Sequence, residues 1–316
     1  MSSFLSGGIS FPVNAISLAK TKGLLDLYFL TIVHEEKSRR IKKRCKKKEG
    51  RIFVGETDIN CNKVLSKSRV KYIQTLFHKK FRDEEKRFII EGPKIINEFL
   101  LVSPRMIHEI FAKEEWIQSN GNVLHNIHND KLTAVTDDDL KKISGLPSPN
   151  QVLAIIEKQE YIFPEVSGNE NILMLDEIQD PGNMGTIIRI ADWFGINKIV
   201  CSKTCADIYN PKVIQSTMGS ILRVKVLYTD LLSWCKNHAF LPVYAATLHG
   251  TSIYEIANIT PGIILMGNES KGIKPELHSL STTKITIPRI GEAESLNAAI
   301  AAGIILSHIT QKTVLR

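Results

Sequence analysis

The stretch NILMLDEIQDPGNMGTIIRIADWFGINKIVCS, residues 171–202, contains two short apolar runs separated by a segment with helical periodicity. The runs NILMLDEI and NKIVCS have the length and the continuous apolar character of strands buried on both faces. A strand, a helix and a second strand in this order are typical of a parallel sheet. The stretch therefore predicts an α/β domain whose sheet is covered by helices on both sides.

The same alternation continues from this stretch to residue 310. Further strands are expected in RVKVLY, PVYAATL, GIILMGN and KITIPR, and further helices over NPKVIQSTMGSI, DLLSWCKNHA and SLNAAIAAGIILSHIT. Ligands of open parallel sheets bind beyond the carboxyl ends of the strands. The loops after Ile178, Met266 and Ile287 are therefore the candidate site loops.

Residues 63–158 contain shorter elements that predict a second, smaller α/β domain. An amphipathic helix is expected over LSKSRVKYIQTLFHKKFR, and then RFIIEG, PKIINEFLLV, MIHEIFA, KLTAVTD, DDLKKIS and QVLAIIEK as alternating strands and helices. Residues 159–170 carry Pro164 and Gly168 and are expected to be a linker to the larger domain, residues 171–316. Residues 1–62 show no clear periodicity and are expected to be a basic extension without predicted order.

The net charge of +8 is concentrated in one tract. Residues 37–51 hold ten Lys or Arg side chains and one Glu, so the rest of the chain is almost neutral. A milder basic excess lies over residues 63–87. Basic surfaces attract phosphate whatever its sequence context, although a basic tract is also compatible with a solvated tail.

The cysteines and the apolar N-terminal segment indicate in which cellular compartment the protein is expected. The five cysteines contain no CxxC pair, which indicates free thiols in a reducing compartment and no zinc site. The apolar segment GLLDLYFLTIV is too short to span a bilayer, and its positive charge follows it instead of preceding it. The sequence HNIH at residues 125–128 favours a polar loop over a metal pair. We therefore expect a cytoplasmic protein without a membrane segment or a bound metal.

The loop after the first strand has neither a dinucleotide fingerprint nor a phosphate loop. Residues 180–183, DPGN, have the composition of a turn, and Asn183 can cap a helix that starts at Met184. Arg189 follows within an otherwise apolar helix. A lone arginine there is either part of a buried structural pair or a functional cation.

The other two loops also combine glycines with polar side chains. In LMGNESKGI, Gly267 and Gly272 allow tight turns and a close approach of a ligand to the main chain. Glu269 lies between them, although the segment is also compatible with an ordinary turn. In IPRIGEAESLNAAIAAGIILSH, residues 287–308, Ser295 is a natural helix cap, and the small residues after Asn297 allow close helix packing.

In this order the three loops resemble the motifs of the TrmH (SpoU) branch of the SPOUT superfamily, whose members are RNA ribose 2′-O-methyltransferases. The matching residues are Asn183, Gly185 and Arg189 in the first motif, Met266, Gly267, Glu269 and Gly272 in the second, and Ile287, Pro288, Gly291, Ser295, Leu296 and Asn297 in the third. Residues 67–157 resemble the substrate-binding domain that accompanies this fold. One departure is Ala298-Ala299, where the family often has Val-Ser.

The resemblance implies a parallel sheet whose C-terminal segment is threaded into a deep trefoil knot, an exception to the rule that chains avoid knots. It implies S-adenosylmethionine as cofactor, with a site lined by Gly267, Ile287 and Leu296 together with Met266 and Pro288. It also implies a homodimer with the closing helix in the interface. No metal is implied.

The resemblance further implies an RNA substrate, with ribosomal RNA favoured over tRNA because of the accessory domain. Arg189 is the family's proposed base for the ribose hydroxyl, but a guanidinium resists deprotonation, so holding phosphate and stabilising the alkoxide is an equal alternative. Asn183, Glu269, Ser295 and Asn297 would orient the nucleotide and the arginine. The rival functions are a non-catalytic RNA-binding protein with the same fold and a methyltransferase acting on a base.

Overall fold

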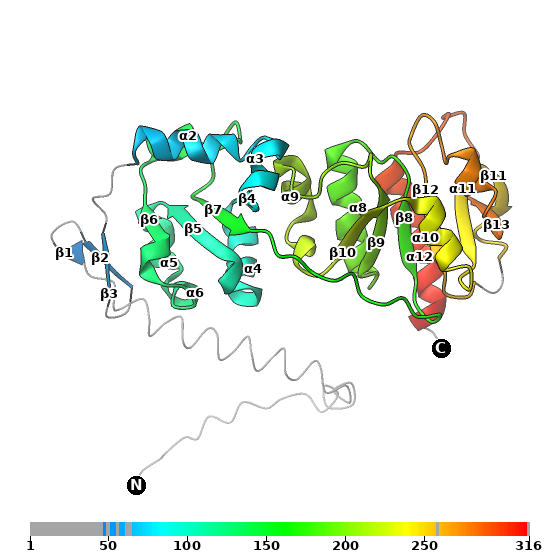
Figure 1. The fold of residues 1–316 in the computed structure, drawn as a ribbon, viewed down its shortest axis with the longest axis horizontal. Coiled ribbons are helices and arrows are strands. Elements are labelled where there is room, and N and C mark those ends of the chain that lie inside the picture. Colours follow the sequence, from blue (N-terminus) through cyan, green and yellow to red (C-terminus); the bar gives the residue numbers. More distant parts are fainter. Residues whose placement is uncertain (1–46, 49–50, 55–56, 61–64, 257–258, 315–316) are drawn as a thin grey trace, which may run out of the picture.

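The computed structural model describes residues 47–48, 51–54, 57–60, 65–256 and 259–314 (Figure 1). Near the N-terminus it contains a small antiparallel sheet of three strands, β1 (Lys47–Lys48), β2 (Arg51–Val54) and β3 (Thr57–Asn60). The sequence did not predict these strands. The remaining part of the expected extension, including Cys45 and Cys61, lies outside the described residues.

The smaller α/β domain is built on a four-stranded sheet in the order β4-β7-β5-β6. Strand β7 pairs antiparallel with β4 and β5, whereas β5 and β6 are parallel. Its strands are β4 (Arg87–Glu91), β5 (Ile107–Ala112), β6 (Leu132–Ala134) and β7 (Val152–Glu157). Its helices are α2 (Lys67–Thr75), α3 (Lys79–Glu84), α4 (Pro93–Val102), α5 (Glu114–Ser119), α6 (Gly121–Leu124) and α7 (Asp137–Ile143), with 3-10 turns η2 (Pro104–Met106) and η3 (Asn129–Lys131).

The expected helix over residues 65–82 is divided into α2 and α3. The N–H groups of Leu76, Phe77 and His78 donate to carbonyls three residues earlier, so the chain tightens after α2 and restarts at Lys79. The apolar spacing that predicts one helix continues across the break, because Leu76 is fully buried. Periodicity alone therefore did not reveal the division.

The stretch between β5 and β6, for which no helix or strand was predicted, contains the short helices α5 and α6. Trp116 and Ile117 on α5, and Val123 and Leu124 on α6, are buried in the domain core. Each helix has at most six residues, which is shorter than the window in which helical periodicity is recognisable. Packing of these four side chains therefore stabilises helices that the pattern does not display.

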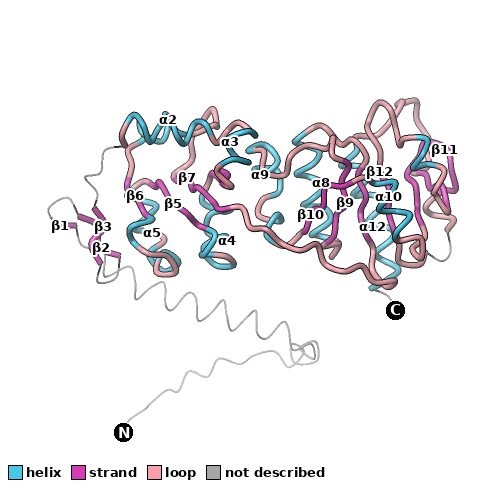
Figure 2. Tube along the Cα trace, in the orientation of Figure 1, coloured by secondary structure: helices cyan, strands magenta, loops and turns pink. Residues whose placement is uncertain are grey.

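The larger domain contains a six-stranded sheet in the order β10-β9-β8-β12-β11-β13, and all of its pairings are parallel. Figure 2 shows the strands of this domain in magenta and its helices in cyan. Its strands are β8 (Ile172–Leu175), β9 (Lys198–Ser202), β10 (Lys225–Thr229), β11 (Val243–Ser252), β12 (Ile263–Met266) and β13 (Thr283–Thr286). Its helices are α8 (Pro181–Trp193), α9 (Pro211–Thr217), α10 (Leu231–Asn237), α11 (Pro275–His278) and α12 (Ala298–Val314), with a 3-10 turn η4 (Ser220–Leu222). The predicted parallel α/β domain is confirmed.

Both faces of this sheet are covered, as the continuous apolar strands predict. One face packs against α8, α9 and α12, and its core includes Leu173, Ile188 and Ile305. The other face packs against α10 and α11, and its core includes Met174 and Trp234. Helix α11 was not predicted from the sequence, because it is only four residues long.

Residues 159–170 contain no helix or strand and run along the larger domain. The Tyr161 hydroxyl accepts the Val226 N–H and donates to the Val226 carbonyl, each at 2.8 Å. The Lys198 ammonium pairs with Glu170 at 2.7 Å. These contacts hold the connecting segment against β9 and β10.

Among the described residues, no helix has the length and the apolar character needed to cross a membrane. Cys201, Cys205 and Cys235 are buried free thiols. The neighbouring Cys201 thiol lowers the pKa of Cys205 to about 7, against the opposing effect of burial.

Candidate active site

The candidate site lies where β8 and β12 end side by side at the centre of the large sheet. The chain order turns back at this point, because β9 and β10 lie on one side of the pair and β11 and β13 on the other. Such a switch point is where open α/β sheets bind their ligands. The loops after β8, after β12 and before α12 all supply polar side chains to it.

Asn183 is not the helix cap that the sequence predicts. Helix α8 begins three residues before Met184, at Pro181, and the Asp180 carboxylate caps it by accepting the Asn183 N–H at 2.7 Å. Proline is favoured at the first helical position because its missing N–H would be unpaired there. With Asp180 as the cap, the Asn183 side chain is free to point into the site.

The Asn183 side chain joins the three loops. Its Nδ2 donates to Glu269 Oε1 at 2.6 Å, and its Oδ1 accepts from Asn297 Nδ2 at 2.8 Å. Asn183 and Glu269 are half-buried, whereas Asn297 is exposed. The structure thus brings together three of the predicted site residues, one from each motif. Glu269 lies in a turn, as the alternative interpretation expects, and its side chain also reaches Asn183.

Asn297 also caps α12, in the place that the sequence predicts for Ser295. Its Oδ1 accepts the N–H groups of Ala299 at 3.0 Å and Ile300 at 3.3 Å. Ser295 is exposed and forms no hydrogen bond with any described residue. The cap prediction for Ser295 is wrong because the helix starts later, at Ala298.

The second loop needs glycine at positions 267 and 272 for two different structural reasons. A Cβ on Gly267 would lie 2.3 Å from the Gly272 carbonyl carbon, so the loop closes on itself only without a side chain there. Gly272 has a φ of +69°, in the left-handed region that favours glycine. The main chains of Asn268 and Gly272 exchange hydrogen bonds of 3.0 and 2.9 Å across the loop.

A charged network that the sequence analysis missed supports the first two loops. Buried Asp176 accepts the Lys274 N–H at 3.0 Å, and the Asn268 amide donates to the Glu177 carbonyl at 2.9 Å. The Lys274 ammonium lies 2.9 Å from Glu177, and this hydrogen bond lowers the pKa of Glu177. Two acidic residues directly after a buried strand were the available signal.

Arg189 lies on the exposed side of α8 and forms no hydrogen bond or ion pair with the residues that the structure describes. The interval of six residues from Asn183 corresponds to a rotation of about 120° around the helix, so the structure does not bring Arg189 into the Asn183 cluster. The alternative of a buried structural pair is therefore wrong. A free guanidinium on an exposed surface is suited to bind an anion.

The predicted cofactor-binding residues lie along the second and third loops. Met266 is buried, Gly267 and Ile287 are half-buried, and Pro288 and Leu296 are exposed. From residue 289 to residue 296, no main-chain N–H has a hydrogen-bond partner among the described residues. Unpaired main-chain donors beside exposed apolar side chains fit an adenosine group, which needs both polar edges and an apolar surface.

The chemistry available at the site is hydrogen bonding and charge stabilisation. Glu269 supplies a carboxylate, Asn183 and Asn297 supply amides, and α8 carries the free guanidinium. Within the described part of the chain, no group of three or more His, Cys, Asp or Glu side chains is placed to hold a metal ion. The arrangement is suited to orienting a polar substrate rather than to forming a covalent intermediate.

Comparisons with known families match both domains separately. Residues 170–307 match the model of the SpoU rRNA methylase family. Residues 67–154 match the model of the MRM3-like substrate-binding domain. The two matches leave only a short interval between them, which falls at the linker.

The chain is similar along most of its length to several known proteins and solved structures. It is 31% identical to the 23S rRNA (guanosine(2553)-2′-O)-methyltransferase RlmP of Bacillus subtilis over 76% of this chain and 95% of the relative. A structure assigned to the TrmH family of RNA methyltransferases, from Porphyromonas gingivalis, is 32% identical with a TM-score of 0.69, covering 79% of this chain and 100% of that one. An AdoMet-bound rRNA methyltransferase from Sinorhizobium meliloti is 28% identical with a TM-score of 0.70, covering 80% and 98%.

Proposed function

The chain belongs to the SpoU (TrmH) family of RNA methyltransferases, and on this premise we propose that it transfers a methyl group from S-adenosylmethionine to a ribose 2′-hydroxyl of ribosomal RNA. The main support for the proposal is the pair of hydrogen bonds made by the Asn183 side chain to Glu269 and Asn297. These hydrogen bonds connect the three family motifs at the switch point of the sheet. Relatives that share both domains are named for ribosomal RNA, which favours that substrate over tRNA.

The second and third loops would hold the cofactor. Met266, Gly267, Ile287, Pro288 and Leu296 would form its surface, and the unpaired N–H groups of residues 289–296 would bind its polar edges. S-adenosylmethionine supplies an electrophilic methyl group on a sulfonium. The protein's own contribution is therefore chiefly to position the hydroxyl in line with that methyl group and to exclude other nucleophiles.

Each polar residue would have a distinct part in positioning the RNA. Glu269 and Asn297 hold the Asn183 amide in one orientation, so that this cluster can orient the ribose. Ser295, exposed and without a partner among the described residues, would contact the nucleotide. Because Arg189 lies outside the cluster, we assign it to a phosphate beside the target ribose, where its charge would also stabilise the developing alkoxide.

The smaller domain would select the RNA. Its match to a substrate-binding domain covers residues 67–154, and this segment begins within the basic residues 63–87. RNA-binding surfaces use such charge for phosphate contacts, whereas the shape of the RNA provides specificity. We therefore place RNA recognition there and the reaction in the larger domain.

The proposal is tested by transfer of labelled methyl from S-adenosylmethionine to total ribosomal RNA and to total tRNA, both from a strain that lacks this protein. Nucleoside analysis then identifies the product. A 2′-O-methylnucleoside in ribosomal RNA is the expected result. A methylated base, label confined to tRNA, or cofactor binding without any transfer would each contradict the proposal in a different part.

We also propose that the protein is a homodimer that uses α8 and α12. Trp193, the last residue of α8, is 83% exposed, and Ile300 on α12 is 56% exposed. The two helices pack against each other, since a Cβ added at Gly303 would lie 3.7 Å from Ile190 Cδ1. Light scattering would detect the dimer, and Trp193→Ser with Ile300→Ser should yield the monomer. A wild-type monomer at micromolar concentration would refute the proposal.

The trefoil knot and the cytoplasmic location remain predictions. We infer the knot from family membership, which implies that the C-terminal segment is the threaded part. In this chain that segment follows β13 and contains residues 287–297 and helix α12.

A further inference from the structure

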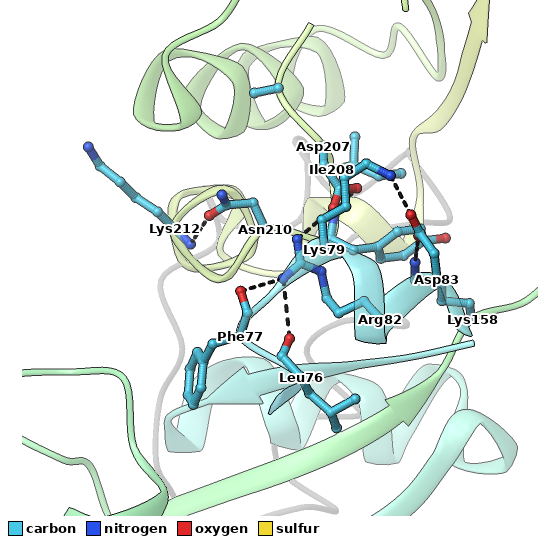
Figure 3. A network of polar contacts seen from close by, with 12 residues as sticks. Leu76, Phe77, Lys79, Arg82, Asp83, Lys158, Asp207, Ile208, Asn210 and Lys212 are labelled. Atoms are coloured by element: carbon cyan, nitrogen blue, oxygen red, sulfur yellow. Dashed lines mark hydrogen bonds and ion pairs between the residues drawn. The ribbon is translucent and has the colours of Figure 1, made fainter. Parts of the chain in front are cut away.

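The break between α2 and α3 is stabilised by a buried arginine (Figure 3). Arg82 on α3 is only 2% exposed, and its Nη1 donates to the carbonyls of Leu76 at 3.2 Å and Phe77 at 2.7 Å. These carbonyls follow the end of α2, where main-chain acceptors have no helical partner. Arg82 therefore closes the end of α2, and its second nitrogen, Nη2, remains for another group.

That nitrogen reaches across the boundary between the domains. Arg82 Nη2 donates to Asp207 Oδ2 at 2.7 Å, and Asp207 belongs to the turn after β9 in the larger domain (Figure 3). The Asp207 side chain is 15% exposed. A charge pair with so little water around it has strong directional hydrogen bonds, and either partner is left uncompensated when the other is removed.

The turn that contains Asp207, residues 202–208, supports the first site loop. The Ala206 N–H donates to the Ile178 carbonyl at 2.9 Å, and the Ser202 hydroxyl accepts the Glu177 N–H at 2.9 Å. The Cys205 thiol donates to the Leu175 carbonyl at 3.3 Å. Three residues of the turn thus hold the segment from the end of β8 toward Asn183.

Helix α9 makes a second connection between the same two places. Ile214 is buried in the core of the smaller domain, and Tyr209 just before α9 packs on Phe88 with ring centroids 4.7 Å apart. On its other side, α9 lies so close to α8 that a Cβ on Gly185 would be 2.4 Å from the Val213 carbonyl oxygen. Gly185 is two residues after Asn183.

We propose that the docked smaller domain fixes the position of Asn183 and that Arg82 and Asp207 are positioning residues for methyl transfer. The proposal rests on the proposed function for its catalytic part. Its structural part is that the Arg82–Asp207 contact holds the turn 202–208, which in turn holds residues 175–178. Neither residue touches the Asn183 cluster, so both act through this segment.

The test compares two carboxylates of similar exposure, each paired with an arginine, although Arg82 is buried and the Arg69 side chain is 33% exposed. Asp207→Asn removes the charge that pairs with Arg82 across the boundary. Glu109→Gln makes the same change within the smaller domain, where Glu109 pairs with Arg69 and its side chain is 14% exposed. A general loss of stability would affect both variants, whereas loss of the domain contact affects only the first.

The first readout is hydrogen exchange of the amides of Glu177, Asn183 and Ala206, which does not depend on the reaction. In Asp207→Asn we expect these amides to exchange at least about tenfold faster than in the wild type, because their supporting turn is loosened. In Glu109→Gln their exchange should be unchanged. Equal exchange in Asp207→Asn and the wild type would overturn the proposal, even if no RNA substrate has been found.

The second readout is the steady-state kinetics with RNA. Asp207→Asn should lower kcat by about tenfold or more, because a small displacement of an orienting residue is costly, while the Kd for S-adenosylmethionine stays within about twofold. Arg82→Lys, which keeps the charge, should retain more activity than Arg82→Ala. A rise in KM with an unchanged kcat would overturn the proposal, since the contact would then serve RNA capture only.

Discussion

The sequence position of Asn183 suggests a helix cap, but in the structure its side chain has a different role. Because Asp180 caps α8, the Asn183 amide is available to donate to Glu269 and to accept from Asn297. An amide can do both at once, whereas a carboxylate can only accept. The residue type at position 183 therefore follows from its two neighbours.

This leads to a prediction for the pair of residues 183 and 269. Asn183→Asp would place two carboxylates at hydrogen-bond distance, and we expect methyl transfer to fall by at least about tenfold because the cluster loses its orientation. Adding Glu269→Gln would restore the hydrogen bond with its polarity reversed. Methyl-transfer rates of the three variants measure this, and a double variant no better than Asn183→Asp would contradict it.

Substitution of Arg189 should affect methyl transfer without affecting the stability of the fold. We expect Arg189→Ala to lower methyl transfer by about a hundredfold or more, the effect typical of losing a group that stabilises transition-state charge. The free energy of unfolding should change by less than about 0.5 kcal/mol, because the side chain is exposed and has no partner among the described residues.

The control for Arg189 is Lys236→Ala, which removes an exposed cation of α10 on the opposite face of the sheet. It should leave transfer, cofactor binding and stability unchanged. Substantial turnover by Arg189→Ala, or an equal loss in the control, would remove the central role that we assign to Arg189.

At the scale of elements, the loop after β12 depends on close contact between its own main-chain atoms. Gly267→Ala would insert a methyl group 2.3 Å from the Gly272 carbonyl carbon. We expect the loop to open, with a loss of about 1–3 kcal/mol in the free energy of unfolding and at least a tenfold weaker binding of S-adenosylmethionine. Thermal unfolding and calorimetric titration measure the two effects.

Gly168→Ala is the matched control, because a Cβ at this linker position has no atom within 4 Å. It should bind the cofactor as the wild type does. If Gly267→Ala also bound normally, the loop would not be the cofactor site that we propose.

Elements were predictable from the sequence in proportion to their length and regularity. Helix α4 has the bounds Pro93–Val102 that the motif PKIINEFLLV suggests. Strands β8, β9 and β12 lie within the expected runs, β10 and β13 each extend one residue beyond them, and β11 continues past the expected run to Ser252. The starts of α8 and α12 were less predictable, because several residues near each start can act as caps. Which of them does so depends on where the preceding strand ends.

At the scale of the whole molecule, the contact between domains has a titratable neighbour. Asp83 is next to Arg82, and its carboxylate lies 2.7 Å from the ammonium of Lys158, which itself lies over the Tyr209 ring. Burial raises the pKa of Asp83, but the hydrogen bonds from Lys158 and Lys79 outweigh it and lower the pKa from 3.8 to about 2. A carboxylate whose pKa is lower in the folded than in the unfolded state stabilises the fold at pH values above its unfolded-state pKa. This stabilisation is lost as the pH falls toward the folded-state pKa.

We therefore expect the stabilising effect of Asp83 to be complete at about pH 5 and partly lost at about pH 3. The difference in Tm between the wild type and Asp83→Asn should decrease over this interval. The effect should be modest because the Asp83 side chain is 46% exposed and solvent screens it. A Tm difference that stayed constant between the two pH values would show that the carboxylate charge does not contribute.

The sequence predicted the alternation of strands and helices, the parallel sheet and the three site loops, because periodicity and turn composition are local properties. Motif spacing, which is also local, predicted the site residues Asn183, Glu269 and Asn297. The junction at Asn183, the free guanidinium of Arg189 and the Arg82–Asp207 contact were decided only by the tertiary structure. Arg82 and Asp207 are separated by 125 positions, and each is an ordinary charged residue in its own segment. Their pairing depends on how the two domains are placed against each other, which no local pattern encodes.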